Sequence, residues 1–172
     1  MKIALVLHNI RSTYNVGAIL RTAEGLGVEK VICSGYTPRY EDENLLPHLR
    51  SKLNHQIEKS AIGAEKLVAQ ENVEDLQAWL AARKKAGSAI IGLENNLNPE
   101  EAKQRLVLGA DELPNAQDVV LILGEEVTGI PPAIRRECDF FLEIPMVGRK
   151  ESFNVSVAAA IALWGVSAPG RK

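Results

Sequence analysis

Short apolar runs that alternate with helical patterns constrain the fold of this chain more than any other feature. The runs, each long enough for one strand, span residues 2–8, 30–33, 88–93, 119–123 and 140–144. Helices are predicted at 15–26, 73–86, 131–137 and 154–166 from the spacing of apolar residues and from stop signals such as Gly27 and Gly87. Strands that are apolar throughout and alternate with helices are typical of a parallel sheet covered on both faces. We therefore predict one α/β domain over residues 1–172, with a mostly parallel sheet and helices on both faces.

Two stretches between these elements are less regular. Residues 35–60 are polar and are interrupted by Pro38 and Pro47, so we expect irregular structure there. Residues 98–101, Asn-Pro-Glu-Glu, combine a capping residue, a first-turn proline and an acidic first turn, which predicts the start of another helix.

Composition excludes several classes of protein. Twenty basic against 22 acidic residues leave a net charge of −2, so the whole chain is not a polycation that coats nucleic acid. Cys33 and Cys138 match neither metal-ligand nor disulfide spacing and are expected as small buried hydrophobes; His8, His48 and His55 are not spaced as a metal site. The chain shows no signal peptide and no apolar run long enough to span a membrane, so a cytoplasmic protein is expected.

The segment 144–164 joins a polar, glycine-containing loop to a helix with almost no polar face. A helix that is apolar nearly all round must be buried on every side. A domain of this size cannot easily hide every side of residues 155–166, including Trp164, so we expect a symmetric dimer interface on this helix. The loop before it would then be held rigidly enough to present backbone groups to a ligand.

Three polar, glycine-bearing segments follow predicted strands, where open parallel sheets bind their ligands. They read NIRSTYNVGAILRTA from residue 9, LILGEEVTGIPP from residue 121, and IPMVGRKESFNVSVAAAIALW from residue 144. The pattern Asn-x-Gly-x-x-x-Arg in the first is easily met by chance. All three, in this order and at these separations, resemble the motifs of the SpoU/TrmH branch of the SPOUT RNA methyltransferases, and the match extends from the first strand almost to the end of the chain.

This resemblance implies an S-adenosylmethionine-dependent enzyme that methylates a ribose 2′-hydroxyl of tRNA or rRNA. It also implies a C-terminal trefoil knot, a rare exception among folds, and a homodimer that packs its knot-region helices and completes each active site across the interface. Some relatives carry a separate N-terminal RNA-binding domain. Here the first motif begins at residue 9, so we expect no such domain, and the core surface would recognise the RNA.

The resemblance assigns five residues to the active site: Asn15, Arg21, Glu126, Ser152 and Asn154. Each also has a purely structural interpretation. Asparagine and serine are preferred helix caps, Glu126 could cap the turn at 129–132, and an exposed arginine is often only a solvated charge.

The role of Arg21 stays open between two alternatives. The family proposal has the arginine take the 2′-hydroxyl proton with help from an RNA phosphate. A guanidinium is protonated almost all the time in proteins. An arginine that only positions the phosphate and stabilises developing oxyanion charge would therefore fit the same sequence.

The resemblance also assigns cofactor contacts. Gly124 would let backbone approach the cofactor, Ile144 and Phe153 would offer main-chain groups, and Met146 would lie close by. The segment 93–96 at the end of the strand 88–93 should also edge the cofactor pocket, and from it we add Leu93. Phe153 stands where the family usually has leucine, which could reshape the adenosyl pocket, and a simple turn is the alternative for Gly124.

RNA contacts are less specific in the sequence. The central region is locally basic, with Arg39, His48, Arg50, Lys52, His55 and Lys59, while Arg11 and Arg149-Lys150 lie in two of the motif loops. A solvated face explains most of these charges equally well.

Other functions predict different features. Related knotted enzymes methylate bases, and a non-catalytic RNA-binding or nucleotide-binding module would have eroded motifs, whereas these are intact. A dinucleotide-binding domain is poorly supported, because Gly25-Leu-Gly27 ends a helix instead of opening one after a strand.

Overall fold

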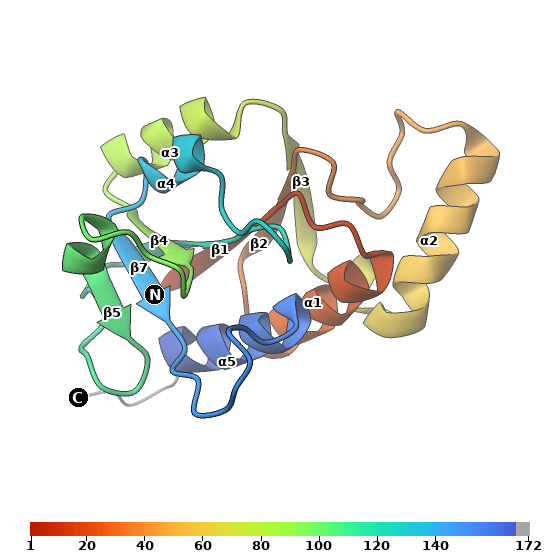
Figure 1. The fold of residues 1–172 in the computed structure, drawn as a ribbon. Helices are drawn as coiled ribbons and strands as arrows, with labels where there is room; N and C mark the ends of the chain where they lie inside the picture. Colours follow the sequence, from red (N-terminus) through yellow and green to blue (C-terminus); the bar gives the residue numbers. More distant parts are fainter. Residues whose placement is uncertain (168–172) are drawn as a thin grey trace.

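The computed structural model describes residues 1–167 and shows one parallel sheet with helices on both faces (Figure 1). Within these residues the strands are β1 (Lys2–His8), β2 (Lys30–Ser34), β3 (Ala69–Val73), β4 (Ala89–Leu93), β5 (Arg105–Val107), β6 (Asp118–Leu123) and β7 (Phe140–Glu143). Their order in the sheet is β3-β2-β1-β6-β4-β7-β5, and all neighbouring pairs are parallel. The predicted α/β architecture is confirmed. The trefoil knot stays a prediction.

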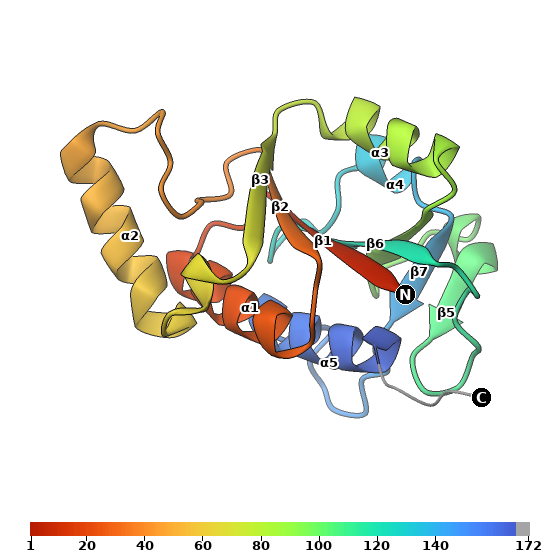
Figure 2. The ribbon, with the colours of Figure 1, turned by 180° about the vertical axis from the view of Figure 1, so that it is seen from behind.

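The helices divide between the two faces of the sheet. They are α1 (Thr13–Gly25), α2 (Pro47–Ala61), α3 (Leu76–Lys85), α4 (Pro132–Arg135) and α5 (Val155–Ser167), with 3-10 turns η1 (Ala64–Lys66) and η2 (Glu101–Gln104). Helices α1 and α5 lie side by side on one face, and α2 packs outside α1; α3 and α4 cover the other face (Figures 1 and 2).

Alternate residues of the central strands enter two separate cores, because successive side chains in a strand point to opposite faces. Leu5 and Leu7 of β1 pack with the residues of α1 and α5. Ala4 and Val6 pack instead with those of α3 and α4. Both faces are buried, which explains why these strands read as continuous apolar runs.

Helix α2 corrects the prediction of irregular structure at residues 35–60. Pro47, which seemed to interrupt the chain, stands at the first helical position, where its missing N–H leaves no hydrogen bond unmade. Of α2, only Asn54, Ile57 and Ala61 are buried. So thin an apolar face produces almost no periodic signal.

Two other predictions were partly wrong. The helix predicted at 73–86 is shorter, because β3 ends at Val73 and the Asp75 side chain caps α3 by accepting from the Ala78 N–H at 2.9 Å. At the helix start predicted from Asn98, the Asn98 Oδ1 does accept from the Glu100 and Glu101 N–H groups at 3.0 Å, but only the short η2 turn follows before β5 begins. Strand β5 has just three residues, none of them fully buried, so it carries little sequence pattern.

Both cysteines are buried and free, as predicted. Burial raises the pKa of Cys33 to about 12 and that of Cys138 to about 12, so neither is a thiolate at neutral pH. No helix among residues 1–167 is long and apolar enough to cross a bilayer.

Gly17, the glycine of the first motif, lies where α1 packs closely against α2. A Cβ placed on it would lie 2.2 Å from Ser60 Oγ and 2.4 Å from the Ile57 carbonyl oxygen. The Ile57 carbonyl belongs to the α2 backbone and cannot swing away as a side chain does. This glycine is therefore required for helix packing.

We expect Gly17→Ala to lower the free energy of unfolding by about 1–3 kcal/mol, because the added methyl forces the two helices apart. Gly25→Ala is the matched control: Gly25 ends the same helix, and a Cβ there meets nothing within 4 Å. Alanine at that position should raise stability by about 0.5–1 kcal/mol. Urea denaturation measures both, and equal stability of the two variants would contradict the packing role.

Candidate functional site

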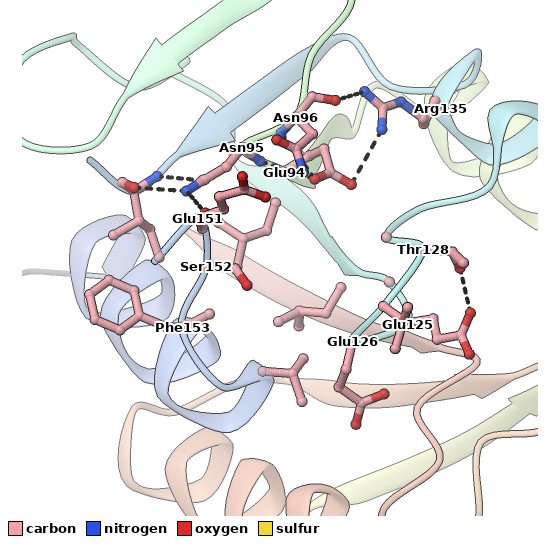
Figure 3. Close-up of a pocket in the computed structure, with 18 residues that line it drawn as sticks. Glu94, Asn95, Asn96, Glu125, Glu126, Thr128, Arg135, Glu151, Ser152 and Phe153 are labelled. Carbon is pink, nitrogen blue, oxygen red and sulfur yellow. Dashed lines mark hydrogen bonds and ion pairs between the residues drawn. The ribbon is translucent and has the colours of Figure 1, made fainter. Parts of the chain in front are cut away.

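The carboxyl ends of β4, β6 and β7 surround a cavity (Figure 3). Parallel strands end at the same edge of the sheet, so the loops that follow them meet there. The lining comes from residues 93–96 after β4, residues 123–129 after β6, and Arg135, Ile144, Glu151, Ser152, Phe153, Val155 and Ala158. Six of the predicted site residues lie in this lining: Leu93, Gly124, Glu126, Ile144, Ser152 and Phe153.

Three predicted active-site residues from the three motifs form one hydrogen-bonded chain. Asn15 Nδ2 donates to Glu126 Oε1 at 2.9 Å, and Asn154 Nδ2 donates to Asn15 Oδ1 at 3.3 Å. These residues are 111 and 139 positions apart in sequence. These two hydrogen bonds are exposed to solvent, so they add little to stability. They join the three motifs at a position that a ligand can reach.

The capping interpretation is wrong for Asn15 and right for Asn154. The cap of α1 is Ser12, whose Oγ accepts from the Asn15 N–H at 3.3 Å. Asn154 does cap α5, since its Oδ1 accepts from the Ser156 N–H at 2.9 Å. Its Nδ2 still reaches Asn15, so capping and site contact coexist in one side chain.

The loop after β6 folds tightly on itself. Glu125 and Gly129 exchange backbone hydrogen bonds of 3.2 and 2.9 Å. A Cβ on Gly124 would lie 2.4 Å from the Ile130 nitrogen. Gly124 is thus required by the turn itself, and its exposed backbone also lines the cavity.

Glu94 connects this loop to the chain after β4. Its carboxylate accepts from the Ile130 N–H at 3.2 Å and pairs with the Arg135 guanidinium at 3.3 Å. Arg135 also binds Glu101 (Nε to Oε1, 2.7 Å), and this hydrogen bond holds the pKa of the Glu101 carboxyl below its usual range. The three side chains are at most 17% exposed, so the network is largely shielded from water.

Asn95 attaches the loop before α5 to the sheet. Its Oδ1 accepts from the Ile144 N–H at 3.2 Å, and its Nδ2 donates to the carbonyls of Ile144 (3.1 Å) and Glu151 (3.2 Å) (Figure 3). One side chain therefore closes the loop that brings Ser152 and Phe153 to the cavity.

Arg11 and Glu125 form an ion pair at the edge of the cavity, where Glu125 is part of the lining. Arg11 Nη2 lies 2.7 Å from Glu125 Oε1. Hydrogen bonds from Thr128 and then from Tyr36, together with the charge of Arg11, lower the pKa of the Glu125 carboxyl, so it stays ionised at neutral pH.

Four predicted residues are not part of the cavity lining. Asn15 and Asn154 join it through their hydrogen bonds to Glu126 and to each other, whereas Arg21 and Met146 have no such link among residues 1–167. Arg21 is exposed on α1 six residues after Asn15, about 9 Å farther along the helix axis. Met146 is partly buried in the loop after β7, but the cavity lining does not include it. The structure thus brings Asn15, Glu126 and Asn154 together and leaves Arg21 separate.

Sequence reasoning missed the residues that hold the loops. It named the stretch 93–96 but singled out only Leu93, while Glu94 and Asn95 make the contacts. Arg135 was read only as part of a short helix. A signal was available, since an acidic residue and an asparagine directly after a buried strand mark the ligand edge of a parallel sheet. Among residues 1–167, no three His, Cys, Asp or Glu side chains gather as metal ligands would.

A parallel sheet with a partly apolar cavity at its carboxyl edge defines a ligand-binding α/β protein. A family model described as the SpoU rRNA methylase family matches residues 2–164. The chain therefore belongs to this family.

Similar proteins agree with this assignment. A Staphylococcus saprophyticus protein assigned to the TrmH family of tRNA/rRNA methyltransferases is 30% identical over 165 residues, which cover 94% of this chain and 57% of the relative. This chain thus spans little more than half the length of that relative.

Solved structures share the fold. An AdoMet-bound rRNA methyltransferase from Sinorhizobium meliloti superposes with a TM-score of 0.76 at 20% identity, covering 95% of this chain and 55% of that one. A second solved structure comes from work on the 2-OH methylation of C/U34 on tRNA. It superposes with a TM-score of 0.72 at 20% identity, covering 95% of this chain and 92% of that one.

We expect Asn95→Ala to loosen the loop between β7 and α5, because Ile144 and Glu151 lose their side-chain partner. Arg149 and Lys150 are exposed in this loop and are trypsin sites. Loss of roughly 1.4 kcal/mol of local stability would speed cleavage there about tenfold, as measured by mass spectrometry of a digestion time course.

Asn96→Ala is the matched control for Asn95→Ala. Asn96 is the exposed neighbour, and its hydrogen bonds to Glu94 and Arg135 use only backbone atoms. Cleavage at wild-type rate in Asn95→Ala would show that the loop does not depend on this amide.

Proposed function

We propose that this chain transfers a methyl group from S-adenosylmethionine to a ribose 2′-hydroxyl of tRNA or rRNA. The observation that carries the proposal is the hydrogen-bonded chain Asn15–Glu126–Asn154, which joins all three family motifs beside the cavity. Family membership supports RNA methylation, and the 2-OH chemistry named for one fold neighbour supports the ribose as acceptor.

The cavity suits an adenosyl compound. Leu93, Leu123, Ile144, Val155 and Ala158 offer apolar surface for a base. Carboxylate and hydroxyl groups at the rim can accept or donate hydrogen bonds to a ribose and to an amino-acid tail. The S. meliloti neighbour holds AdoMet, which supports the same cofactor here.

In the proposed reaction the 2′-oxygen would bond to the methyl carbon while the electron pair of the breaking sulfur–carbon bond stays on sulfur, which leaves as a neutral thioether. The hydroxyl proton would pass to solvent water, to which this site is exposed. When bound, the cofactor supplies the electrophilic methyl group. The chain's own contribution is to hold acceptor and donor in line, which can carry much of the rate. Glu126 keeps acceptor capacity beyond its bond to Asn15 and is suited to orient the hydroxyl.

Arg21 fits the role of phosphate clamp better than that of base within one protomer. It is exposed on α1 and separate from the Asn15–Glu126–Asn154 chain. A guanidinium binds a phosphate through two parallel hydrogen bonds, and it stays charged while doing so. We infer that Arg21 grips the RNA backbone beside the acceptor nucleotide.

The test is incubation with methyl-labelled S-adenosylmethionine and bulk tRNA and rRNA from a strain that lacks this gene. Alkaline digestion then separates the two enzymatic alternatives, because a 2′-O-methyl group blocks cleavage at its own linkage. Label in an alkali-resistant dinucleotide is expected. Label in a mononucleotide base would overturn the ribose assignment, and absence of both labelling and cofactor binding by calorimetry would favour a non-catalytic binding module.

We expect Arg21→Ala to lower methyl transfer by about 100-fold, because it removes the phosphate contact that would position the acceptor nucleotide, and misplacement of a substrate can cost this much. Cofactor affinity measured by calorimetry should not change. Arg136→Ala is the matched control, since Arg136 is an exposed arginine that follows α4 on the opposite face of the sheet. Unchanged methylation by Arg21→Ala would exclude both roles considered for this residue.

We also propose that the protein acts as a homodimer in the cytoplasm, where its RNA substrates are found. Helix α5 was expected to be buried on every side, yet Trp164 is 64% and Val157 46% exposed in the single chain, and Phe153 just before the helix is 40% exposed. A second copy packed on this face would remove these apolar groups from water.

Trp164→Glu should convert a dimer to a monomer, because a buried carboxylate on the interface is strongly unfavourable. Light scattering after size-exclusion chromatography measures the mass. Leu67→Glu, which places the same charge on a 72% exposed apolar residue after η1, should leave the mass unchanged. A wild-type mass equal to one chain would contradict the dimer.

A further inference from the structure

Tyr36 and Arg11 form an exposed pair of side chains beside the proposed active site. The Arg11 guanidinium carbon lies 5.6 Å from the centre of the Tyr36 ring, and Arg11 Nε donates to the Tyr36 hydroxyl at 3.4 Å. Tyr36 is 51% exposed and the Arg11 side chain 72%. An aromatic ring and a guanidinium plane are thus presented together to solvent.

The loop that carries Tyr36 is fastened to the loop after β1. Thr37 is buried; its Oγ1 donates to the Leu7 carbonyl at 2.8 Å and accepts from the Ile10 N–H at 3.0 Å. Two strands that end side by side are thereby joined just past their last residues. The backbone on either side of the Tyr36 ring has little freedom to move.

Asn9 and Gly35 complete this support with unusual backbone conformations. Asn9 has a φ of 61°, and its Oδ1 accepts from the Tyr36 N–H at 3.3 Å. Gly35 has a φ of 63°, and a Cβ on it would lie 1.9 Å from Asn9 Oδ1. Glycine and asparagine are the residues that tolerate this left-handed conformation best, so both residues can hold the Tyr36 backbone in place at little conformational cost.

The pair lies next to the residues proposed to act on the acceptor ribose. Arg11 binds Glu125, which directly precedes Glu126, and Glu126 accepts from Asn15. Tyr36 and Arg11 are nevertheless outside the lining of the cofactor cavity. Their position therefore suits a group of the RNA rather than the methyl donor.

Stability does not account for this arrangement. A cation–π contact between side chains as exposed as Tyr36 and Arg11 contributes little to folding. The Arg11 side chain is 72% exposed, so water also screens its ion pair with Glu125. At a surface position such as 36, a hydrophilic side chain would avoid exposing apolar area to water. The Tyr36 ring exposes such area. The hydrogen-bonded support of an exposed ring is better explained by a ligand that uses the ring.

We propose that Tyr36, supported by Arg11, is a stacking platform for an unpaired base of the RNA, at or directly beside the nucleotide that is methylated. Aromatic rings and guanidinium planes are the groups on which proteins stack splayed-out bases. The platform would make the enzyme select a loop or other single-stranded site over a regular duplex. This proposal rests on the proposed RNA methylation.

The experiment uses a short RNA that carries the nucleotide mapped by the labelling assay, and RNAs in which the base at that position or at either neighbour is removed. Tyr36→Ala should lower kcat/KM for the intact RNA by about 5- to 150-fold, the range for loss of one stacked base. Tyr36→Phe, which keeps the ring, should stay within about threefold of wild type. Cofactor affinity and melting temperature should not change in either.

The decisive readout is the coupling between ring and base. At one of the three positions, removing the base should lower kcat/KM of the wild-type enzyme by about the same factor as Tyr36→Ala lowers it on intact RNA. Combining the variant with that abasic RNA should lower kcat/KM little more than either change alone. A purely structural role of Tyr36 would lower activity equally on intact and abasic RNA. Tyr36→Leu, which keeps apolar bulk, repeats the test if the alanine variant is unstable.

The outcomes separate this proposal from the one on which it rests. The stacking platform would be overturned, with RNA methylation left intact, by either of two results. One is that the losses of kcat/KM from Tyr36→Ala and from base removal multiply at all three positions; the other is that Tyr36→Ala is as active as wild type. Failure of the wild-type protein to label any RNA would overturn both.

Discussion

Burial of both faces of a parallel sheet is the constraint on which the rest of this structure depends. Because every strand runs the same way, every loop with functional side chains leaves from one edge, and residues more than 100 positions apart meet there, as Asn15 and Glu126 do. Helices occupy both faces, so the edge is the one place where these strands can offer groups to a ligand.

The loops at this edge are held by a few polar side chains. Glu94 binds the loop after β6, Asn95 binds the loop before α5, and Thr37 binds the loop after β1. Each satisfies backbone groups that would otherwise be unpaired near the interior, where an unmade hydrogen bond is costly. The proposed reactive residues can therefore remain exposed while the backbone that carries them stays in place.

The sequence predicted the deeply buried elements well and the thinly buried ones poorly, for a physical reason. Strands β1 and β6 are buried on both faces, and their apolar runs are unmistakable. Helix α2 buries too little, and β5 is too short, for any periodicity to appear. At the candidate site, motif recognition singled out Asn15, Glu126 and Asn154, which the structure brings together, but not Asn95 or Glu94. Their roles depend on which distant backbone groups lie opposite, and that geometry arises only from the strand order.

Asn154 carries two duties on the two ends of a single amide. The oxygen caps the N-terminus of α5 by accepting from the Ser156 N–H, and the nitrogen donates to the Asn15 side chain. Asparagine is the shortest side chain that has both an acceptor and an NH₂ donor. Aspartate or serine could keep the oxygen's role, but neither could supply the amide donor. Both the start of α5 and the candidate site therefore require asparagine at position 154. A substitution there would disturb the placement of α5 and the hydrogen bonds among Asn15, Glu126 and Asn154 together.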